Sequence, residues 1–138
     1  IKIRYIIHDS TAKEVDEKTF FSTRESGGTL ISSSYDLIKN IIVDEKIMDN
    51  IYIFQYSDGD NWSADDSTKC IDLLKNFFLP TVNLFGYAQT TSRYGSGAFI
   101  KILQQQFQQN PPDELVVGQI NKKEDISSII KQFLGKGK

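Results

Sequence analysis

The sequence is poor in cysteine and histidine, with one of each in 138 residues. Cys70 has no second cysteine with which to form an internal disulfide, and this favours a reducing compartment. No apolar run approaches the roughly 18 residues of a transmembrane helix, and no signal-peptide pattern opens the chain. These absences favour a cytoplasmic protein that does not span a membrane.

Several common functional motifs are also absent. The sequence has no phosphate-binding G-x-x-x-x-G-K-[ST] loop, no dinucleotide-binding G-x-G-x-x-G, no zinc-protease H-E-x-x-H and no hydrolase G-x-S-x-G. The formal net charge of -2 gives no electrostatic reason to expect nucleic acid. The sequence therefore points away from these enzyme classes and from a nucleic-acid partner.

What is present is typical of a globular domain. Hydrophobic residues make up 39% of the sequence and charged residues 25%, which are ordinary shares. A chain of this length is expected to form one domain with a real core. The chain begins with Ile1 inside a strand-like run and without Met, which suggests a fragment of a longer protein.

The first part of the chain has strand-like patterns. Apolar and polar residues alternate over residues 1–8, and this pattern predicts a strand. Residues 12–16 are predicted to form a short, charged strand at the edge of a sheet. Residues 18–21 are predicted to form a brief turn or a further extended piece.

The rest of the chain alternates between helical and strand patterns. Apolar residues recur at helical spacing near 31–45, 63–79, 98–109 and 121–134, with caps predicted at Ser63 with Asp66, at Asn121 with Glu124 and at Gly135. Strands are predicted at 51–56, 82–87 and 114–120. Strands alternating with helices imply a mostly parallel sheet with helices on both faces, the α/β class.

The segment Asn50–Trp62 is the strongest strand signal and ends in acidic residues. The apolar run Ile51–Tyr56 is predicted to be a strand buried on both faces, and Asp58 and Asp60 follow it directly. The carboxyl ends of parallel strands are where open α/β sheets bind ligands. Carboxylates there suit Mg²⁺, Mn²⁺ or Ca²⁺. The alternative is a plain turn whose aspartates cap it and the next helix.

Other polar residues have two interpretations each. Thr29 and the serines Ser32–Ser34 would add neutral oxygens from another loop. His8 is a ligand or general base in one interpretation and a structural or surface residue in the other. Trp62 either packs over the acidic turn or, if exposed, serves a partner surface. Cys70 lies on the apolar stripe of its helix and is expected to be buried.

Two of these loops together resemble part of a known domain. Gly27-Gly28-Thr29, a helix, and a strand ending in Ser57-Asp58-Gly59 are similar to the second half of a von Willebrand factor A domain. In that family, such a threonine and such an aspartate contribute to a metal-ion-dependent adhesion site (MIDAS). The resemblance implies a three-layer, Rossmann-like fold with Thr29 and Asp58 as metal ligands.

Longer stretches narrow the resemblance to the bacterial YeaH/YhbH family, also known as sporulation protein YhbH. The similar stretches lie at 12–17, 25–29, 50–52, 57–62 and 82–87. This resemblance implies a cytoplasmic bacterial protein linked to stress responses or sporulation. It also implies a serine protein kinase and a SpoVR-type protein as partners.

The chain departs from the family pattern at its start. No Asp-x-Ser-x-Ser motif occurs, since Asp9-Ser10-Thr11 has the wrong spacing. The resemblance therefore implies that residues 1–138 form a single von Willebrand A-like domain that lacks its first strand and helix. Strands 1–8 and 51–56 would then close up against each other, or another chain, such as a second copy, would fill the gap.

Two function hypotheses follow. In the first, the chain is a non-enzymatic protein-interaction module. Its full-length form binds a carboxylate of a partner protein through a bound Mg²⁺ or another divalent ion. Because Thr29 and Asp58 alone do not hold Mg²⁺, no tightly bound metal is expected in this fragment. In the second, Asp58, Asp60 and His8 form the site of a metal-dependent hydrolase or phosphoryl-transfer enzyme.

Overall fold

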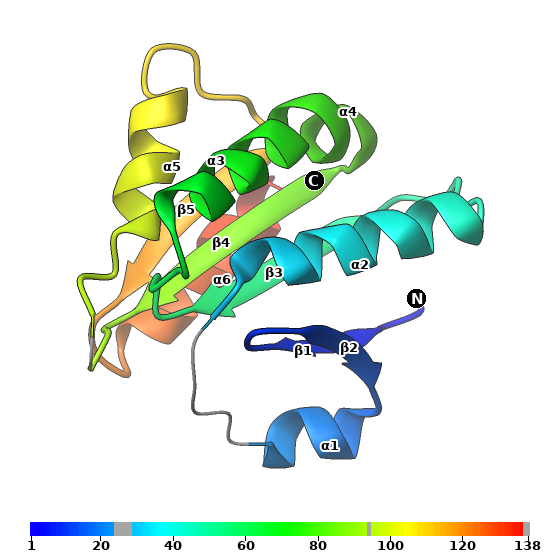
Figure 1. Ribbon diagram of the computed structural model, residues 1–138, viewed down its shortest axis with the longest axis horizontal. Coiled ribbons are helices and arrows are strands. Elements are labelled where there is room, and N and C mark those ends of the chain that lie inside the picture. Colours follow the sequence, from blue (N-terminus) through cyan, green and yellow to red (C-terminus); the bar gives the residue numbers. More distant parts are fainter. Residues whose placement is uncertain (24–28, 94, 137–138) are drawn as a thin grey trace. The chain divides into compact units, whose positions relative to one another are not determined.

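The computed structural model describes residues 1–23, 29–93 and 95–136, which fall into two compact units (Figure 1). The first unit comprises Ile1–Ile47 and Asn61–Cys70, and the second comprises Met48–Asp60 and Ile71–Lys138. Each unit has its own sheet, of two strands in the first and three in the second. Parallel strands between helices confirm the α/β class.

The sheet of the first unit is a hairpin of β1 (Tyr5–His8) and β2 (Ala12–Val15). The two strands are antiparallel, and His8 lies opposite Ala12. The predicted strand at 1–8 is too long, because β2 provides hydrogen-bonding partners only for Tyr5–His8. The charged edge strand predicted at 12–16 is confirmed except for its last residue.

The segment after β2 is helical, so the turn or extended piece predicted at 18–21 is wrong. Helix α1 spans Glu17–Ser22, and the Asp16 carboxylate caps it by accepting a main-chain N–H of its first turn at 2.7 Å. The Phe20 ring packs on Tyr5 of β1, with centroids 5.2 Å apart. The cap and this contact with another strand together stabilise a six-residue helix whose apolar pattern is too short to predict.

Helix α2 (Ile31–Asp44) confirms the amphipathic stripe expected there, with Ile31, Tyr35 and Ile42 buried. Helix α3 (Ala64–Leu73) begins as predicted, because the Ser63 hydroxyl accepts the main-chain N–H of Asp66 at 3.1 Å.

Helix α3 continues into a π-helical turn, η1 (Leu74–Phe78), and a short helix, α4 (Leu79–Thr81). The N–H of Leu79 bonds to the carbonyl of Leu74, five residues earlier. Pro80 has no N–H to continue the α-helical pattern, and the helical stretch ends one residue after it. The stop predicted at Pro80 is therefore confirmed to within one residue.

The sheet of the second unit is fully parallel. It contains β3 (Tyr52–Ser57), β4 (Leu84–Thr90) and β5 (Leu115–Ile120) in that order. Among the described strands, β1 pairs with β2 and β3 with β4. Strands β1 and β3 belong to different units, so the predicted closing of strand 1–8 onto strand 51–56 stays a prediction.

Helices cover both faces of this sheet (Figure 1). Helix α6 (Asp125–Lys136) covers one face with Ile129 and Phe133, which pack with three residues of the strands, Leu84, Ala88 and Val116. A Cβ on Gly118 of β5 would lie 2.1 Å from the Ile129 side chain, so glycine is needed for this close approach. Helix α5 (Phe99–Phe107) lies on the opposite face, where Phe99 packs on Tyr87 with centroids 5.3 Å apart.

Strand β3 is not buried on both faces, contrary to the prediction. Gln55 is buried, but the alternating residues Tyr52, Phe54 and Tyr56 are 44%, 44% and 49% exposed. The physical reason is that β3 is at the edge of the sheet, while α6 packs mainly on β4 and β5.

Helix α6 differs from prediction at both ends. The Asp125 carboxylate accepts the N–H groups of Asn121 and Lys122, at 2.9 and 3.1 Å, in place of the predicted cap of Asn121 with Glu124. The helix also continues past Gly135 to Lys136.

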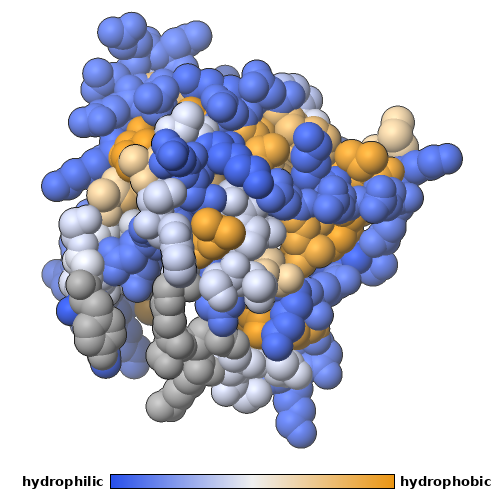
Figure 2. All heavy atoms as spheres, viewed as in Figure 1, coloured by the Kyte–Doolittle hydropathy of each residue, from blue (hydrophilic) through white to orange (hydrophobic). Residues whose placement is uncertain are grey.

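The surface matches the ordinary composition. In Figure 2, hydrophilic residues occupy most of the visible face and hydrophobic residues form smaller areas between them. The glutamine run of α5 is exposed at Gln104, Gln105 and Gln106, as a solvated helix face is. In the described part of the chain, no helix has the length and apolar character that a membrane span requires.

Candidate functional site

The acidic turn Ser57–Asp60 lies at the carboxyl end of β3. The Ser57 hydroxyl accepts the N–H of Gly59, and Oδ1 of Asp58 accepts the N–H of Asp60, both at 3.0 Å. Gly59 has φ +79°, in the left-handed region that favours glycine. The turn is therefore held by its own side chains, as the plain-turn alternative predicted, but Ser63 and not one of these aspartates caps the next helix.

Asp58 keeps one carboxylate oxygen available. Its side chain is half-buried, and within the described chain Oδ2 accepts no hydrogen bond. A carboxylate fixed through one oxygen and open at the other can accept a metal ion or a donor from a partner.

Asp60 is engaged through both oxygens. Its Oδ1 accepts the N–H of Gly97 at 2.8 Å, and its Oδ2 accepts the Ser92 hydroxyl. These bonds tie the loop before α5 to the acidic turn. Asp60 therefore has a structural role here, which argues against the enzyme hypothesis that uses it as a catalytic group.

Gln89, near the end of β4, organises this edge of the sheet and was not predicted. It is 3% exposed, its Oε1 accepts the Tyr87 hydroxyl at 2.9 Å and the N–H of Ile100 at 3.0 Å, and its Nε2 donates to the Gly97 carbonyl at 2.7 Å. A Cβ on Gly59 would lie 2.0 Å from Gln89 Oε1. The only sequence signal is an amide side chain that follows the apolar run of a buried strand.

A cavity of about 340 Å³ lies beyond the ends of β4 and β5. Hydroxyl and amide side chains line it with Lys101, and none of the described lining residues is a carboxylate. The N–H groups at the start of α5 are already bonded to Gly59, Asp60 and Gln89. Among its described lining residues the cavity therefore offers a cation no carboxylate, and these three N–H groups are not available to an anion.

Thr29, the other predicted ligand, belongs to the first unit, and Asp58 belongs to the second. The Thr29 carbonyl accepts the N–H of Trp62 at 2.8 Å, while its hydroxyl makes no hydrogen bond among the described residues. Gly27 and Gly28 of the same predicted loop lie outside the described residues. A metal ion shared by Thr29 and Asp58 stays a prediction.

The serines after Thr29 are not loop ligands, contrary to expectation. Ser32, Ser33 and Ser34 lie in the first turn of α2. The hydroxyls of Ser33 and Ser34 donate to main-chain carbonyls three residues earlier, at 2.6 and 2.9 Å. These two hydroxyl protons are therefore used within the first turn of the helix.

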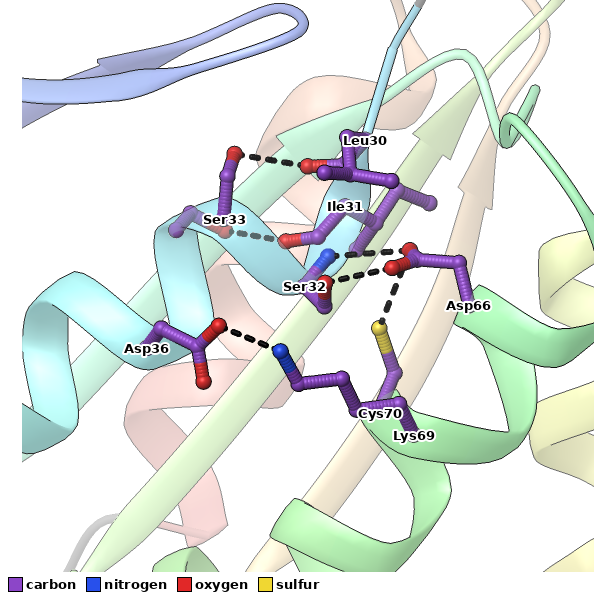
Figure 3. A network of polar contacts seen from close by, with 9 residues as sticks. Leu30, Ile31, Ser32, Ser33, Asp36, Asp66, Lys69 and Cys70 are labelled. Carbon is purple, nitrogen blue, oxygen red and sulfur yellow. Dashed lines mark hydrogen bonds and ion pairs between the residues drawn. The ribbon is translucent and has the colours of Figure 1, made fainter.

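Ser32 instead bonds to Asp66, in a polar network between α2 and α3 (Figure 3). Asp66 is 8% exposed and accepts both the N–H of Ser32, at 3.1 Å, and its hydroxyl. Nearby, Lys69 of α3 pairs with Asp36 of α2 at 2.5 Å, and both side chains are about half exposed. Sequence reasoning assigned Asp66 only to the cap of α3, because its partner lies 34 residues away.

Cys70 is buried, as predicted, and lies beside Asp66 in the same network (Figure 3). Burial, and next the negative charge of Asp66, raise the pKa of the Cys70 thiol. A buried, protonated thiol is a poor nucleophile, so Cys70 is not a candidate catalytic residue.

His8 and Trp62 both belong to the first unit. His8 is partly buried at the end of β1 and lines a small cavity of about 130 Å³ with Asp9 and Lys13. Trp62 is 69% exposed, which agrees with the exposed alternative. Among the described residues, no three His, Cys, Asp or Glu side chains are grouped closely enough to hold a metal ion.

Comparisons with known proteins identify the family. The family model described as "Protein of unknown function (DUF444)" matches residues 1–137. A UPF0229 protein of Shewanella oneidensis is 39% identical over 99% of this chain and 32% of its own length, and one of Erwinia tasmaniensis is 36% identical over the same shares. A UPF0229 protein of Thiobacillus denitrificans is 48% identical over 64% of this chain and 22% of its own length.

The chain thus spans about a third of the length of the two relatives that match it almost throughout. No solved structure matches it. The match to the family model over nearly all residues agrees with the resemblance to YeaH/YhbH-type proteins. The chain belongs to the DUF444 family of uncharacterised UPF0229 proteins.

Proposed function

We propose that this chain is a protein-interaction module of a von Willebrand A-like kind, in which Asp58 and Thr29 contribute to a divalent-cation site. Asp58 carries the proposal, because it follows a parallel strand at the sheet edge where α/β folds bind ligands. Its Oδ1 is fixed by the N–H of Asp60, while Oδ2 is available to an ion within the described chain.

The contrast with Asp60 supports this assignment. Both oxygens of Asp60 hold the loop before α5, and this loop in turn fixes the turn that carries Asp58. Asp60 is therefore a positioning residue, and Asp58 is the ligand. Thr29 supplies a second, neutral oxygen, and the remaining ligands come from elsewhere in the full-length protein and from a carboxylate of the partner.

The family resemblance supports a biological setting for this module. It favours a cytoplasmic bacterial protein of stress responses or sporulation, with a serine protein kinase and a SpoVR-type protein as partners. Mg²⁺ is the first ion to test, because hard oxygen ligands suit it.

The test is a pull-down of these two proteins by the full-length protein, with Mg²⁺ and with a chelator. Asp58→Ala and chelation are each expected to abolish capture of the same partner. Asp113→Ala, which removes an exposed carboxylate from the loop before β5, is the matched control and is expected to capture normally. Capture that survives both Asp58→Ala and chelation would overturn the proposal.

A further inference from the structure

An exposed apolar surface lies on the second unit, and we call it the β3–α6 surface. Its six side chains are all 43–61% exposed, and they are Tyr52, Phe54 and Tyr56 of β3 and Ile126, Ile130 and Leu134 of α6. Each group repeats at the spacing of its element, every second residue in the strand and every fourth in the helix. Each group therefore forms a continuous stripe.

The aromatic stripe lies on the same face of the sheet as α6. In the parallel pairing of β3 with β4, Tyr52 is opposite Leu84, Phe54 is opposite Gly86, and Tyr56 is opposite Ala88. Leu84 and Ala88 belong to the core that α6 covers. Side chains at paired positions point to the same face, so the three aromatic side chains of β3 point to the α6 side.

The aliphatic stripe lies on the β3 side of α6. Along the helix, Ile129 lies over Gly118 of β5, and Phe133 lies over Gly86 of β4 and stacks on Phe54 of β3 at 5.5 Å. A step of four residues turns about 40° around a helix and a step of one about 100°. The rotation from Ile129 to Phe133 therefore leads from β5 toward β3.

Ile130 and Leu134 continue that rotation beyond Phe133, so the aliphatic stripe faces the uncovered side of β3. The two stripes meet at Phe54 and Phe133. The aromatic stripe of β3 and the aliphatic stripe of α6 are therefore two adjoining parts of one apolar surface.

The dimensions of this surface fit a helix. Strands are spaced about 4.8 Å apart and packed helices about 8–10 Å apart, so one helix covers about two strands. In this unit α6 covers β4 and β5 and leaves β3 uncovered. The next helix position on this face lies over β3, beside the stripe of Ile126, Ile130 and Leu134.

We propose that an amphipathic helix of the same polypeptide, from outside residues 1–138, packs on the β3–α6 surface. The two relatives that match nearly all of this chain do so with 32% of their length, so a protein of this family has further chain to supply it. Six side chains of about 150–250 Å², half exposed, provide roughly 450–750 Å². Stable interfaces between separate proteins bury about 800 Å² on each partner, so this surface favours a tethered segment over a second copy.

The proposal is independent of the metal site and is tested without added metal ions, in the full-length protein. Ile130→Glu places a charge on the β3–α6 surface, and Ser128→Glu places the same charge at an exposed position on another side of α6. We expect Ile130→Glu to lower the Tm by at least about 4 °C relative to Ser128→Glu. Ile130→Ala gives the same comparison with a smaller shift if Ile130→Glu does not fold.

Hydrogen–deuterium exchange of the same variants identifies what covers the surface. We expect Ile130→Glu to increase exchange in a segment outside residues 1–138, with the protein monomeric in sedimentation whether or not it carries the change. Equal Tm values for the two glutamate variants would overturn the proposal, because the surface would then be exposed. A dimer that Ile130→Glu dissociates, or increased exchange only within residues 1–138, would also overturn it.

Discussion

At the level of single residues, Asp58 and Asp60 differ in the hydrogen bonds that their carboxylates accept. Asp60 accepts from the part-buried N–H of Gly97 and from Ser92, whereas among the described residues Asp58 accepts only from the N–H of Asp60. The sequence identified both aspartates as candidates, since acidic residues after a strand are visible locally. It did not separate them, because the partners of Asp60 lie 32 and 37 residues away.

This difference predicts a stability change for Asp60→Ala. The substitution leaves the part-buried N–H of Gly97 without its acceptor, and we expect a loss of about 1–3 kcal/mol in the free energy of unfolding. Urea unfolding followed by circular dichroism measures it. Asp113→Ala, at an exposed position, is expected to change stability by less than about 0.5 kcal/mol. Equal stabilities of the two variants would contradict the structural role of Asp60.

The buried thiol of Cys70 predicts a pH dependence. Burial raises its pKa above the ordinary value of 9.0, so above that pH the unfolded chain releases the thiol proton while the folded chain keeps it. The unfolded state then binds fewer protons, and stability falls as pH rises, by up to about 1.4 kcal/mol per pH unit from this group.

The measurement is urea unfolding between pH 7 and 10.5 for the natural chain and Cys70→Ala. The alanine variant loses packing at every pH but has no thiol to titrate. We expect the stability difference between the two proteins to shrink above pH 9. A difference that is constant with pH would show that the thiol titrates normally.

At the level of elements, the sequence predicted what depends on local pattern. Helices α2, α3 and α5 and all three parallel strands follow from apolar periodicity and caps. Helix α1 did not, because it depends on the contact of Phe20 with Tyr5 of another element. The burial of β3 also could not be predicted, since it depends on which strands α6 covers.

The close packing of α6 on β5 predicts the effect of Gly118→Ala. The added Cβ would lie 2.1 Å from Cδ1 of Ile129, so either the helix or the side chain must move. We expect a loss of about 1–3 kcal/mol. Adding Ile129→Val, which removes Cδ1, should recover part of that loss in a double-mutant cycle.

Gly135→Ala is the control for this prediction, because Gly135 lies in α6, the helix that packs on Gly118, and its Cβ would meet nothing within 4 Å. It is expected to be neutral or to stabilise the helix by up to about 1 kcal/mol. If Gly118→Ala is also neutral, α6 can shift on β5 without loss, and its packing there is looser than the structure shows.

At the level of the whole molecule, the candidate metal site depends on residues that the sequence places far apart. Thr29 and Asp58 are proposed as ligands from the family resemblance, and each keeps an oxygen without a hydrogen bond in the described chain. Mg²⁺ prefers six oxygen ligands in octahedral geometry and gives up its waters reluctantly. Two protein oxygens from two loops therefore compete poorly with water for the ion.

Calorimetric titration with Mg²⁺ tests this argument. We expect no saturable binding at micromolar Mg²⁺ by residues 1–138 alone, and saturable binding by the full-length protein that Asp58→Ala removes. The Asp113→Ala variant of the full-length protein should bind like the natural one, since its carboxylate lies before β5 and away from the acidic turn. Stoichiometric, tight binding by residues 1–138 would mean that this chain holds the whole site, and the ligands beyond Thr29 and Asp58 would then have to be found within it.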